Sequence, residues 1–293
     1  MVSSAATATQ TETGSTRPAR PRRKVGVWVA LFIILLLFAL ALSAPLWADD
    51  PARQSLMDAE LPPYPLENST VEHLLGTDEL GRDQLSRILF GLRTSMSISI
   101  LSMLLAAAIG TSVGVIAGFF RGIVDEVLMR IVDIQMSFPA ILLVVTFVTA
   151  IGPSFQSIVI VLALSIWVVF ARVARAQVLA LRDSDLVLAM RAIGASTPRV
   201  LLLHIVPNIA GPLIVIATLE FATLIVAESA LGYLGLGVPP PTPSLGAMIA
   251  TGQFGLITGV WWLVLGPGIA MTAFIMSINI LGDWLRDRLD PRR

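Results

Sequence analysis

A run of charged residues lies between two long apolar stretches of this chain, from Arg182 to His204. Its charges include Asp183, Asp185 and Arg191. Four apolar residues within the run are spaced i, i+3, i+4 and i+7: Leu186, Ala189, Met190 and Ile193. That spacing predicts a short helix with one apolar face, flanked by the charges. Such an element, protruding from an apolar region, is suited to being bound by a soluble partner.

A corner is expected directly after this helix. Asp183 and Ser184 can cap its start. Gly194 can adopt a left-handed conformation, and Ser196-Thr197-Pro198 is typical of an N-cap followed by proline at the start of another helix. We therefore expect a helix, a sharp turn at Gly194 and a second helix that re-enters the apolar region.

One glycine pattern resembles a catalytic motif, but its setting favours a structural role. Gly110-Thr111-Ser112-Val113-Gly114 fits the G-x-S-x-G pattern of a serine hydrolase, which requires a strand-to-helix turn. Here the pattern lies inside an apolar stretch, and Ser112 has no histidine or lysine nearby in the sequence. Gly110, Gly114 and Gly118 instead form a four-residue repeat, which lets two helices approach closely in lipid. We expect helix packing rather than hydrolysis.

Other candidates for catalysis or cofactor binding are weak. Gly232, Gly235 and Gly237 loosely resemble a phosphate loop, yet no βαβ pattern precedes them, so a bend at a helix end is expected. Lys24 is the only lysine and is followed by valine, which excludes a Walker A sequence. His73 and His204 fall on opposite sides of the predicted membrane. We expect no catalytic residue, no metal and no cofactor bound by this chain itself.

The elements that carry these residues are predicted to be membrane helices. Hydrophobic residues make up 55% of the chain and charged residues 14%, which indicates an integral membrane protein. A formal net charge of zero implies no attraction to nucleic acid. A helix needs about 20 apolar residues to cross the bilayer. Six stretches qualify: 25–47, 94–119, 127–151, 155–174, 205–231 and 257–281. The fold class expected is all-α, a polytopic membrane protein with six transmembrane helices.

Basic residues predict the orientation of these spans. With the amino-terminal tail in the cytoplasm, sixteen basic residues lie inside and four outside, as the positive-inside rule requires. The tail (1–24), the charged segment (182–204) and the carboxyl terminus (286–293) are then cytoplasmic. Residues 48–93 form an external segment, and the five-helix core covers 94–285. The tail has low complexity and is expected to be disordered. A cleaved signal peptide is the alternative for the first span, whose apolar core is longer than such peptides have.

Two glutamates lie within the fifth predicted span. An ionised side chain costs about 2.5–3.5 kcal/mol at the centre of a membrane helix. Glu220 and Glu228 should therefore face protein or water rather than lipid. Two interpretations stay open. The glutamates line a polar translocation path with Trp167 of the fourth span, or they make buried hydrogen bonds to a neighbouring helix, with a position at the membrane interface as a further alternative for Glu228.

The charged segment resembles the cytoplasmic coupling segment of ABC-importer permeases. That pattern is Glu-Ala-Ala, three residues, Gly, and a proline thirteen positions on; Leu188-Ala189-Met190, Gly194 and Pro207 match the spacing. Leu188 replaces the glutamate and Met190 the second alanine, so an ion pair through the glutamate is not expected. The resemblance implies docking on an ATPase by Arg182, Asp183, Asp185, Leu186, Leu188, Ala189, Met190, Arg191, Ala192, Ile193, Gly194 and Pro207.

The rest of the chain resembles the C-type permease subunit of dipeptide and oligopeptide importers. The segment from His73 to Asp83 looks like its external signature, and Ser137-Phe138-Pro139, Leu234-Gly235-Leu236-Gly237 and Gly282-Asp283-Trp284 are further matches. We expect the signature to contact an external binding protein through Gly76, Thr77, Asp78, Glu79, Gly81, Arg82 and Asp83. The alternative is that this segment only caps the second span.

The resemblance implies a type I ABC-importer permease fold that forms half of a translocation pathway in the bacterial inner membrane. The partners implied are a homologous second permease subunit, two cytoplasmic ATPase subunits or domains that bind ATP and Mg²⁺, an external solute-binding protein and a peptide substrate. Nickel or another small solute is the alternative within the family. Outside it, the alternatives are a stand-alone secondary transporter, suggested by Glu220 and Glu228, and an intramembrane enzyme.

Overall fold

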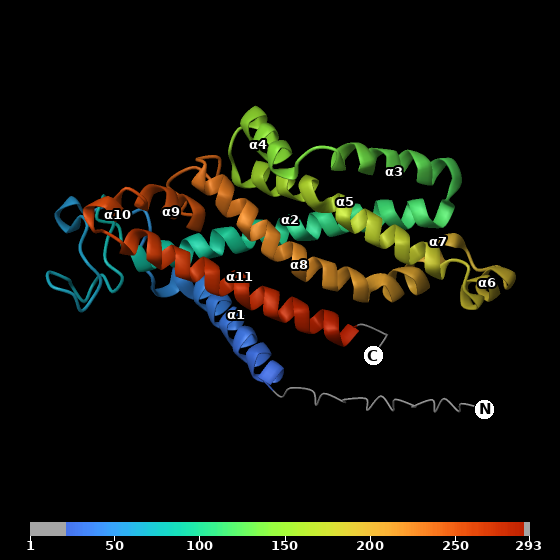
Figure 1. Ribbon diagram of the computed structural model, residues 1–293, viewed down its shortest axis with the longest axis horizontal. Coiled ribbons are helices and arrows are strands. Elements are labelled where there is room, and N and C mark those ends of the chain that lie inside the picture. Colours follow the sequence, from blue (N-terminus) through green and yellow to red (C-terminus); the bar gives the residue numbers. More distant parts are fainter. Residues whose placement is uncertain (1–21, 290–293) are drawn as a thin grey trace, which may run out of the picture.

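The computed structural model describes residues 22–289 as helices joined by loops (Figure 1). The long helices are α1 (Arg22–Trp47), α2 (Gln84–Phe120), α5 (Phe155–Leu181), α8 (Val206–Tyr233) and α11 (Trp262–Leu289). The shorter ones are η1 (Leu56–Asp58), α3 (Gly122–Met136), α4 (Ala140–Ile151), α6 (Asp185–Ala192), α7 (Thr197–Val200), η2 (Leu201–Ile205), α9 (Leu245–Gly252) and α10 (Gly255–Thr258). Residues 1–21, which make up most of the expected disordered tail, and residues 290–293 lie outside the described part.

The all-α prediction is confirmed. Within residues 22–289, five helices are long and apolar enough to cross a membrane, and one bent pair can form a sixth crossing. In the same part of the chain, extended backbone pairs only at an isolated bridge between Thr77 and Asp83. The expected six crossings are therefore reached when the bent pair is taken as one span.

That bent pair corrects the prediction of a single third helix over residues 127–151. α3 and α4 meet at an angle of 87°. Pro139 explains the break, because proline has no backbone N–H and its ring disfavours helical geometry in the residue before it. α3 consequently lies along α2 and α5, whereas α4 runs in a different direction and packs on α5 (Figure 1).

Several helix boundaries also differ from the predicted ones. α2 begins at Gln84 rather than at residue 94, because Asp83 caps its first turn by accepting a hydrogen bond from the Ser86 N–H at 2.7 Å. The helical run into α8 already begins at Thr197 and contains a π-helical turn, η2, just before Pro207. Pro207 cannot donate a backbone hydrogen bond, and one residue further on the Asn208 side chain donates to the His204 carbonyl at 2.6 Å.

α2 and α5 share the most extensive helix contact. A Cβ atom would lie 2.2 Å from the Trp167 carbonyl oxygen at Gly110, and 2.3 Å from the Ala171 carbonyl oxygen at Gly114. The glycine repeat therefore serves close helix packing, as expected. Ser112 lies within α2 and donates its hydroxyl to the Ala108 carbonyl at 2.7 Å, so it does not occupy a strand-to-helix turn.

The other glycine pattern ends α8 and seats α9 against it. Gly235 has a φ of +77°, which places a left-handed turn just after α8. A Cβ atom at Gly232 would lie 2.9 Å from the Ala247 backbone nitrogen of α9, and one at Gly237 would lie 2.7 Å from the Gly232 Cα atom. These glycines form a bend at a helix end, as expected, and no phosphate loop. α9 also contacts α11, while α1 packs mainly on α11.

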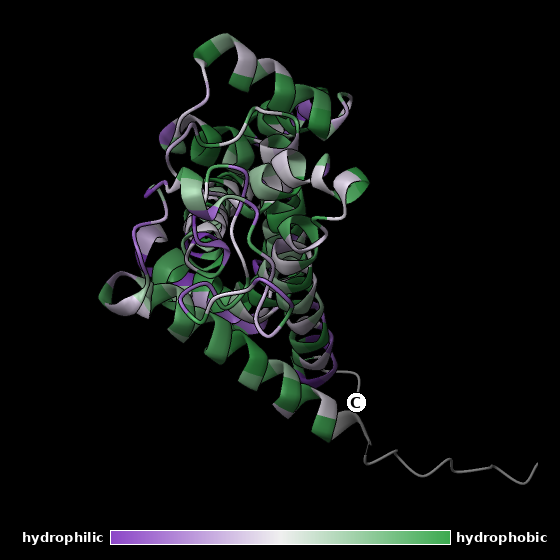
Figure 2. Ribbon diagram, turned by 90° about the vertical axis from the view of Figure 1, so that its left-hand side faces the viewer, coloured by the Kyte–Doolittle hydropathy of each residue, from purple (hydrophilic) through white to green (hydrophobic). Residues whose placement is uncertain are grey.

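The bundle has two polar ends. The loop end consists of residues 48–83 and 234–261, and the α6 end consists of residues 182–196 with the adjoining helix ends (Figure 1). Figure 2 looks onto the loop end, where hydrophilic residues gather in the loops in front of apolar helices. The candidate functional residues lie mostly at these two ends.

Candidate functional site

α6 is held to the rest of the chain along one side. Val187 is 3% exposed and packs into a cluster with Phe119 of α2 and Val178 of α5, and Met190 is half-buried against the same cluster. Leu186, Leu188 and Ile193 are instead 55%, 49% and 83% exposed. Three large apolar side chains thus point away from the chain that carries them. Asp185, Ala189, Ala192 and Pro207 are exposed as well.

The corner after α6 is made as expected. Gly194 has a φ of +81°, in the left-handed region. No atom lies within 4 Å of the position a Cβ atom would take there, so the constraint is backbone conformation and not space. The Ala195 N–H donates to the Met190 carbonyl at 3.0 Å, which closes the end of α6. Ser196 then precedes α7, with Pro198 in its first turn.

Charged side chains in and next to α6 contact the end of α2. Arg182 donates from Nη1 to the Phe119 carbonyl at 2.5 Å, and the Arg191 guanidinium lies 4.8 Å from the centre of the Phe119 ring. Asp183 contacts Arg121 at 3.0 Å and Arg182 at 3.1 Å. The expected capping of α6 is not observed, because the Asp183 carboxylate is taken up by these two guanidiniums. Ser184 is the N-cap residue, but its side chain makes no capping hydrogen bond.

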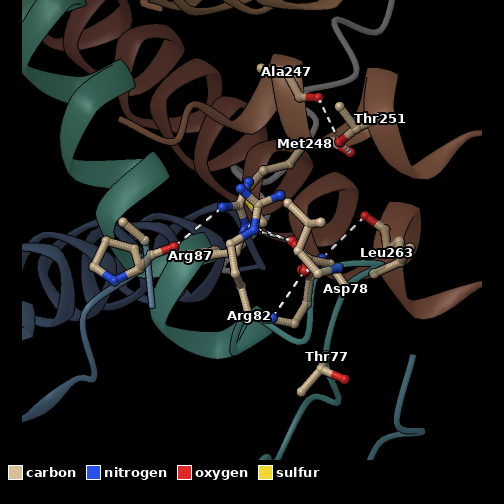
Figure 3. Close-up of polar contacts among 12 residues, drawn as sticks. Thr77, Asp78, Arg82, Arg87, Ala247, Met248, Thr251 and Leu263 are labelled. Atoms are coloured by element: carbon tan, nitrogen blue, oxygen red, sulfur yellow. Dashed lines mark hydrogen bonds and ion pairs between the residues drawn. The ribbon is translucent and has the colours of Figure 1, made fainter. Parts of the chain in front are cut away.

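At the loop end, Asp78 organises the signature segment. Its Oδ1 accepts hydrogen bonds from the backbone N–H groups of Leu80 and Arg82, both at 3.0 Å. Its Oδ2 lies 2.7 Å from Nε of Arg82 and 3.3 Å from Nε of Arg87 (Figure 3). One buried carboxylate therefore closes the loop and binds two guanidiniums.

The neighbouring signature residues are also used within the chain. Asp83 caps α2 and lies 3.1 Å from Nδ1 of His73. The Thr77 hydroxyl donates to the Asp58 carbonyl, and the Thr77 carbonyl accepts from the Trp262 indole at 3.1 Å. The capping role anticipated as an alternative is thus present.

The two signature glycines have no room for a side chain. Gly76 and Gly81 have φ values of +77° and +68°, and a Cβ atom at Gly81 would lie 1.7 Å from the Ser55 carbonyl oxygen. Between Gly76 and Asp83, Glu79 is the charged residue whose side chain is exposed, while Arg82 is half-buried. Contact with a partner through this segment would therefore involve chiefly Glu79.

Two of the three residues expected in a translocation path, Trp167 and Glu228, lie at different helix interfaces. Trp167 of α5 donates its indole N–H to Oε1 of Gln135 in α3 at 2.7 Å. Glu228 is 1% exposed, lies beside Ser95 of α2, and has its Oε2 3.4 Å from the Ser229 hydroxyl. Its Oε1 has no hydrogen-bond partner among the described residues. Glu220 is half-buried. Trp167 and Glu228 are therefore enclosed by protein in this conformation.

Two ion pairs join α3 to α5 that the sequence did not predict. Asp125 binds Arg175 through two contacts, at 2.5 and 2.7 Å, and Asp133 binds Arg172 at 2.7 Å. The available signal was that Asp133 and Arg172 fall inside predicted spans, where a charge requires a partner. The pairing itself could not be read from spacing, because α3 and α5 are separated by α4.

Comparison with known proteins places the chain in a family. Residues 110–293 match the family described as "Binding-protein-dependent transport system inner membrane component". The chain is 41% identical over 263 residues to the di/tripeptide transport system permease protein DppC of Pseudomonas aeruginosa, covering 89% of this chain and 86% of that protein. It is 39% identical over 266 residues to the oligopeptide transport system permease protein OppC of Bacillus subtilis, covering 90% and 85%.

Solved structures support the fold. An inward-facing structure of the MetNI methionine ABC transporter matches with a TM-score of 0.56 at 20% identity, over 69% of this chain and 96% of that chain. The bundle described above is therefore the fold of an ABC-importer permease, with several membrane crossings. Because the family match covers more than half of the chain, and relatives align over most of its length, the chain belongs to the binding-protein-dependent transport system inner membrane components.

Proposed function

We propose that this chain forms half of the translocation pathway of an ATP-driven importer for dipeptides or oligopeptides. The names of the two relatives, di/tripeptide and oligopeptide permeases, support a peptide rather than nickel as the substrate. A homologous second permease subunit supplies the other half. The chain itself is not an enzyme: ATP and Mg²⁺ bind to two cytoplasmic ATPase subunits or domains.

The exposed apolar side chains of α6 are the observation that supports this proposal most directly. Leu186, Leu188 and Ile193 present apolar surface to solvent at a polar end of the molecule, while Val187 anchors the same helix. Leu186 and Ile193 are seven residues apart and fall on one side of α6, while Leu188 lies on the other flank of Val187; large apolar side chains exposed in this way are typical of a helix that binds a partner. In our proposal that groove belongs to an ATPase, and Arg182, Asp183, Asp185 and Arg191 lie at its rim.

The orientation follows from the same assignment. The α6 end and both termini lie in the cytoplasm of a bacterium, and the loop end faces the external solute-binding protein. When the ATPases close around ATP, α6 moves with them and carries α5 and α8 between inward-open and outward-open states. Glu220, Glu228 and Trp167 stay candidates for the path, which the movement of helices would expose.

Gly194 tests the mechanical link. Valine at a φ of +81° is strained by about 1–2 kcal/mol, which changes a conformational equilibrium by a factor of about 5–30. In the reconstituted complex, Gly194→Val should lower peptide uptake and peptide-stimulated ATP hydrolysis together, by about tenfold. Gly194→Asn is the matched control, because asparagine tolerates left-handed backbone, and it should keep most of both activities.

The outcomes distinguish a defect in coupling from a defect in the translocation pathway. Wild-type rates in Gly194→Val would show that this corner does not transmit work. A loss of uptake with ATP hydrolysis that still responds to peptide would place the defect in the pathway and not in docking. Absence of peptide-stimulated hydrolysis in the wild-type complex would reject the peptide substrate.

A further inference from the structure

A cavity of about 230 Å³ opens at the loop end, between the signature segment and helices α9 and α11. Its walls include Asp78, Glu79, Arg82 and Arg87 on one side. Thr251 of α9 and Leu263 of α11 lie on the other side (Figure 3). Pockets for drug-sized ligands measure roughly 300–1,000 Å³. The cavity therefore suits a smaller ligand.

Two guanidiniums in this wall share one carboxylate. Nε of Arg82 and Nε of Arg87 lie 2.7 and 3.3 Å from the same oxygen of Asp78. The side chain of Arg87 is 9% exposed, and that of Arg82 is 19% exposed. Arg87 also donates from Nη1 to the Pro51 carbonyl at 3.3 Å, a neutral acceptor. One positive charge of the pair is thus left without a bound carboxylate among the described residues, next to open space.

A negative charge stands in the same wall but apart from this pair. Glu79 lines the cavity, its side chain is exposed, and it forms no ion pair within residues 22–289. Arg82, Arg87 and Asp78 together therefore leave one positive charge, and Glu79 adds a separate carboxylate to the same wall. Guanidinium groups bind carboxylates with directed, charge-assisted hydrogen bonds, and a free carboxylate is the matching partner for an ammonium. The complementary small molecule is a zwitterion.

We propose that this cavity binds a short peptide with free termini, with its carboxylate on Arg82 and Arg87 and its ammonium on Glu79. The proposal rests on the proposed function, because it assigns to this chain a contact with the transported peptide. The site lies at the loop end, where a peptide leaving the binding protein would first meet the permease. The same guanidiniums keep their structural contact with Asp78.

Binding can be measured without the binding protein, which would otherwise dominate recognition of the peptide. The complex of both permease subunits and the ATPases is placed in nanodiscs, and alanyl-phenylalanine is titrated by saturation-transfer NMR. Its carboxyl amide and its N-acetyl derivative each lack one charge. Removing a charged hydrogen-bond partner is expected to weaken binding about tenfold, so the free dipeptide should bind about tenfold more tightly than either derivative.

Variants connect each terminus to its residue. Arg82→Gln should abolish the preference for the free carboxylate and keep the preference for the free ammonium, whereas Glu79→Gln should do the reverse. Arg53→Gln and Glu67→Gln change exposed residues of the same end and should bind like the wild type. The Glu79 side chain is exposed and forms no ion pair within residues 22–289, so Glu79→Gln remains informative if Arg82→Gln folds poorly.

Two results would overturn the site. One is absence of dipeptide binding by the complex; the other is equal discrimination by the wild type, Arg82→Gln and Glu79→Gln. Uptake of the same dipeptide with the binding protein present is measured in parallel. Normal uptake together with either result rejects the cavity and keeps the proposed function, whereas absence of uptake in the wild type rejects the function first.

Discussion

At Gly114 the absence of a side chain decides how closely two helices lie together. The backbone of α2 meets the backbone of α5 at this residue, and a Cβ atom would come within 2.3 Å of the Ala171 carbonyl oxygen. Because the Ala171 oxygen belongs to the backbone of α5, it cannot rotate away as a flexible side chain could. The α2–α5 pair is thus joined by backbone contact along the repeat of Gly110, Gly114 and Gly118.

Gly114→Ala should therefore destabilise the full chain, by about 1–3 kcal/mol, because one added methyl forces the two helices apart. Gly268→Ala is the matched control. Gly268 also lies inside a helix, α11, but no atom lies within 4 Å of its Cβ position, so alanine should be neutral or stabilise by up to about 1 kcal/mol. Thermal unfolding of the purified chain in detergent measures both. Equal melting temperatures for the two variants would contradict the packing role.

Individual residues were predictable where spacing alone carries the role. The four-residue glycine repeat and the left-handed Gly194 are local patterns, and the structure bears them out. The part played by Asp78 was not predictable, because it depends on Arg87 at its side and on a loop closed by Trp262, which is distant in the sequence. The charged residues of the signature segment suggested a contact with a partner. In the folded chain most residues of this segment are buried and contact other parts of the same chain.

Among the elements, α3 is joined to α5 by two ion pairs. The Asp125–Arg175 pair is bidentate, with side chains 15% and 35% exposed, while the Asp133–Arg172 pair has one contact and side chains about half exposed. Partial burial and two hydrogen bonds make the first pair the stronger one. α3 should therefore be held to α5 chiefly near its amino-terminal end.

Double-mutant cycles separate the two pairs. Asp125→Asn and Arg175→Gln should show a coupling free energy of about 1 kcal/mol in thermal unfolding of the chain. The cycle with Asp133→Asn and Arg172→Gln serves as the control and should give about 0.3 kcal/mol. A stronger coupling in the second cycle, or none in either, would show that α3 is positioned by other contacts.

Helices were predictable as apolar stretches, but their ends and breaks were less so. Hydropathy does not register Pro139, since the apolar pattern of residues 127–151 runs on through the bend. In α6 the periodicity identified the helix, yet the buried residue is Val187 and the exposed apolar ones include Leu188. The spacing of apolar residues shows which side of a helix is apolar. Which side chains of α6 are buried depends on where α2 and α5 pack against it.

On the scale of the whole molecule, orientation is a prediction that labelling can test. The chain has no cysteine, so single cysteines can be introduced without background. A membrane-impermeant maleimide should label Gln54→Cys at the loop end in intact cells, and Ala192→Cys at the α6 end only after permeabilisation. Both positions are exposed, which makes labelling depend on sidedness. The opposite pattern would place α6 outside the cell and remove it from any cytoplasmic ATPase.

The way α6 is attached has a consequence for evolution. Its own chain holds it through Val187, Met190 and the charges of Arg182 and Arg191. Leu186, Leu188 and Ile193 take little part in that attachment. Substitutions at these three positions can therefore accumulate without harm to the permease bundle. If α6 docks on an ATPase as proposed, a duplicated transporter could come to use a different ATPase by changing a few exposed side chains of this short helix.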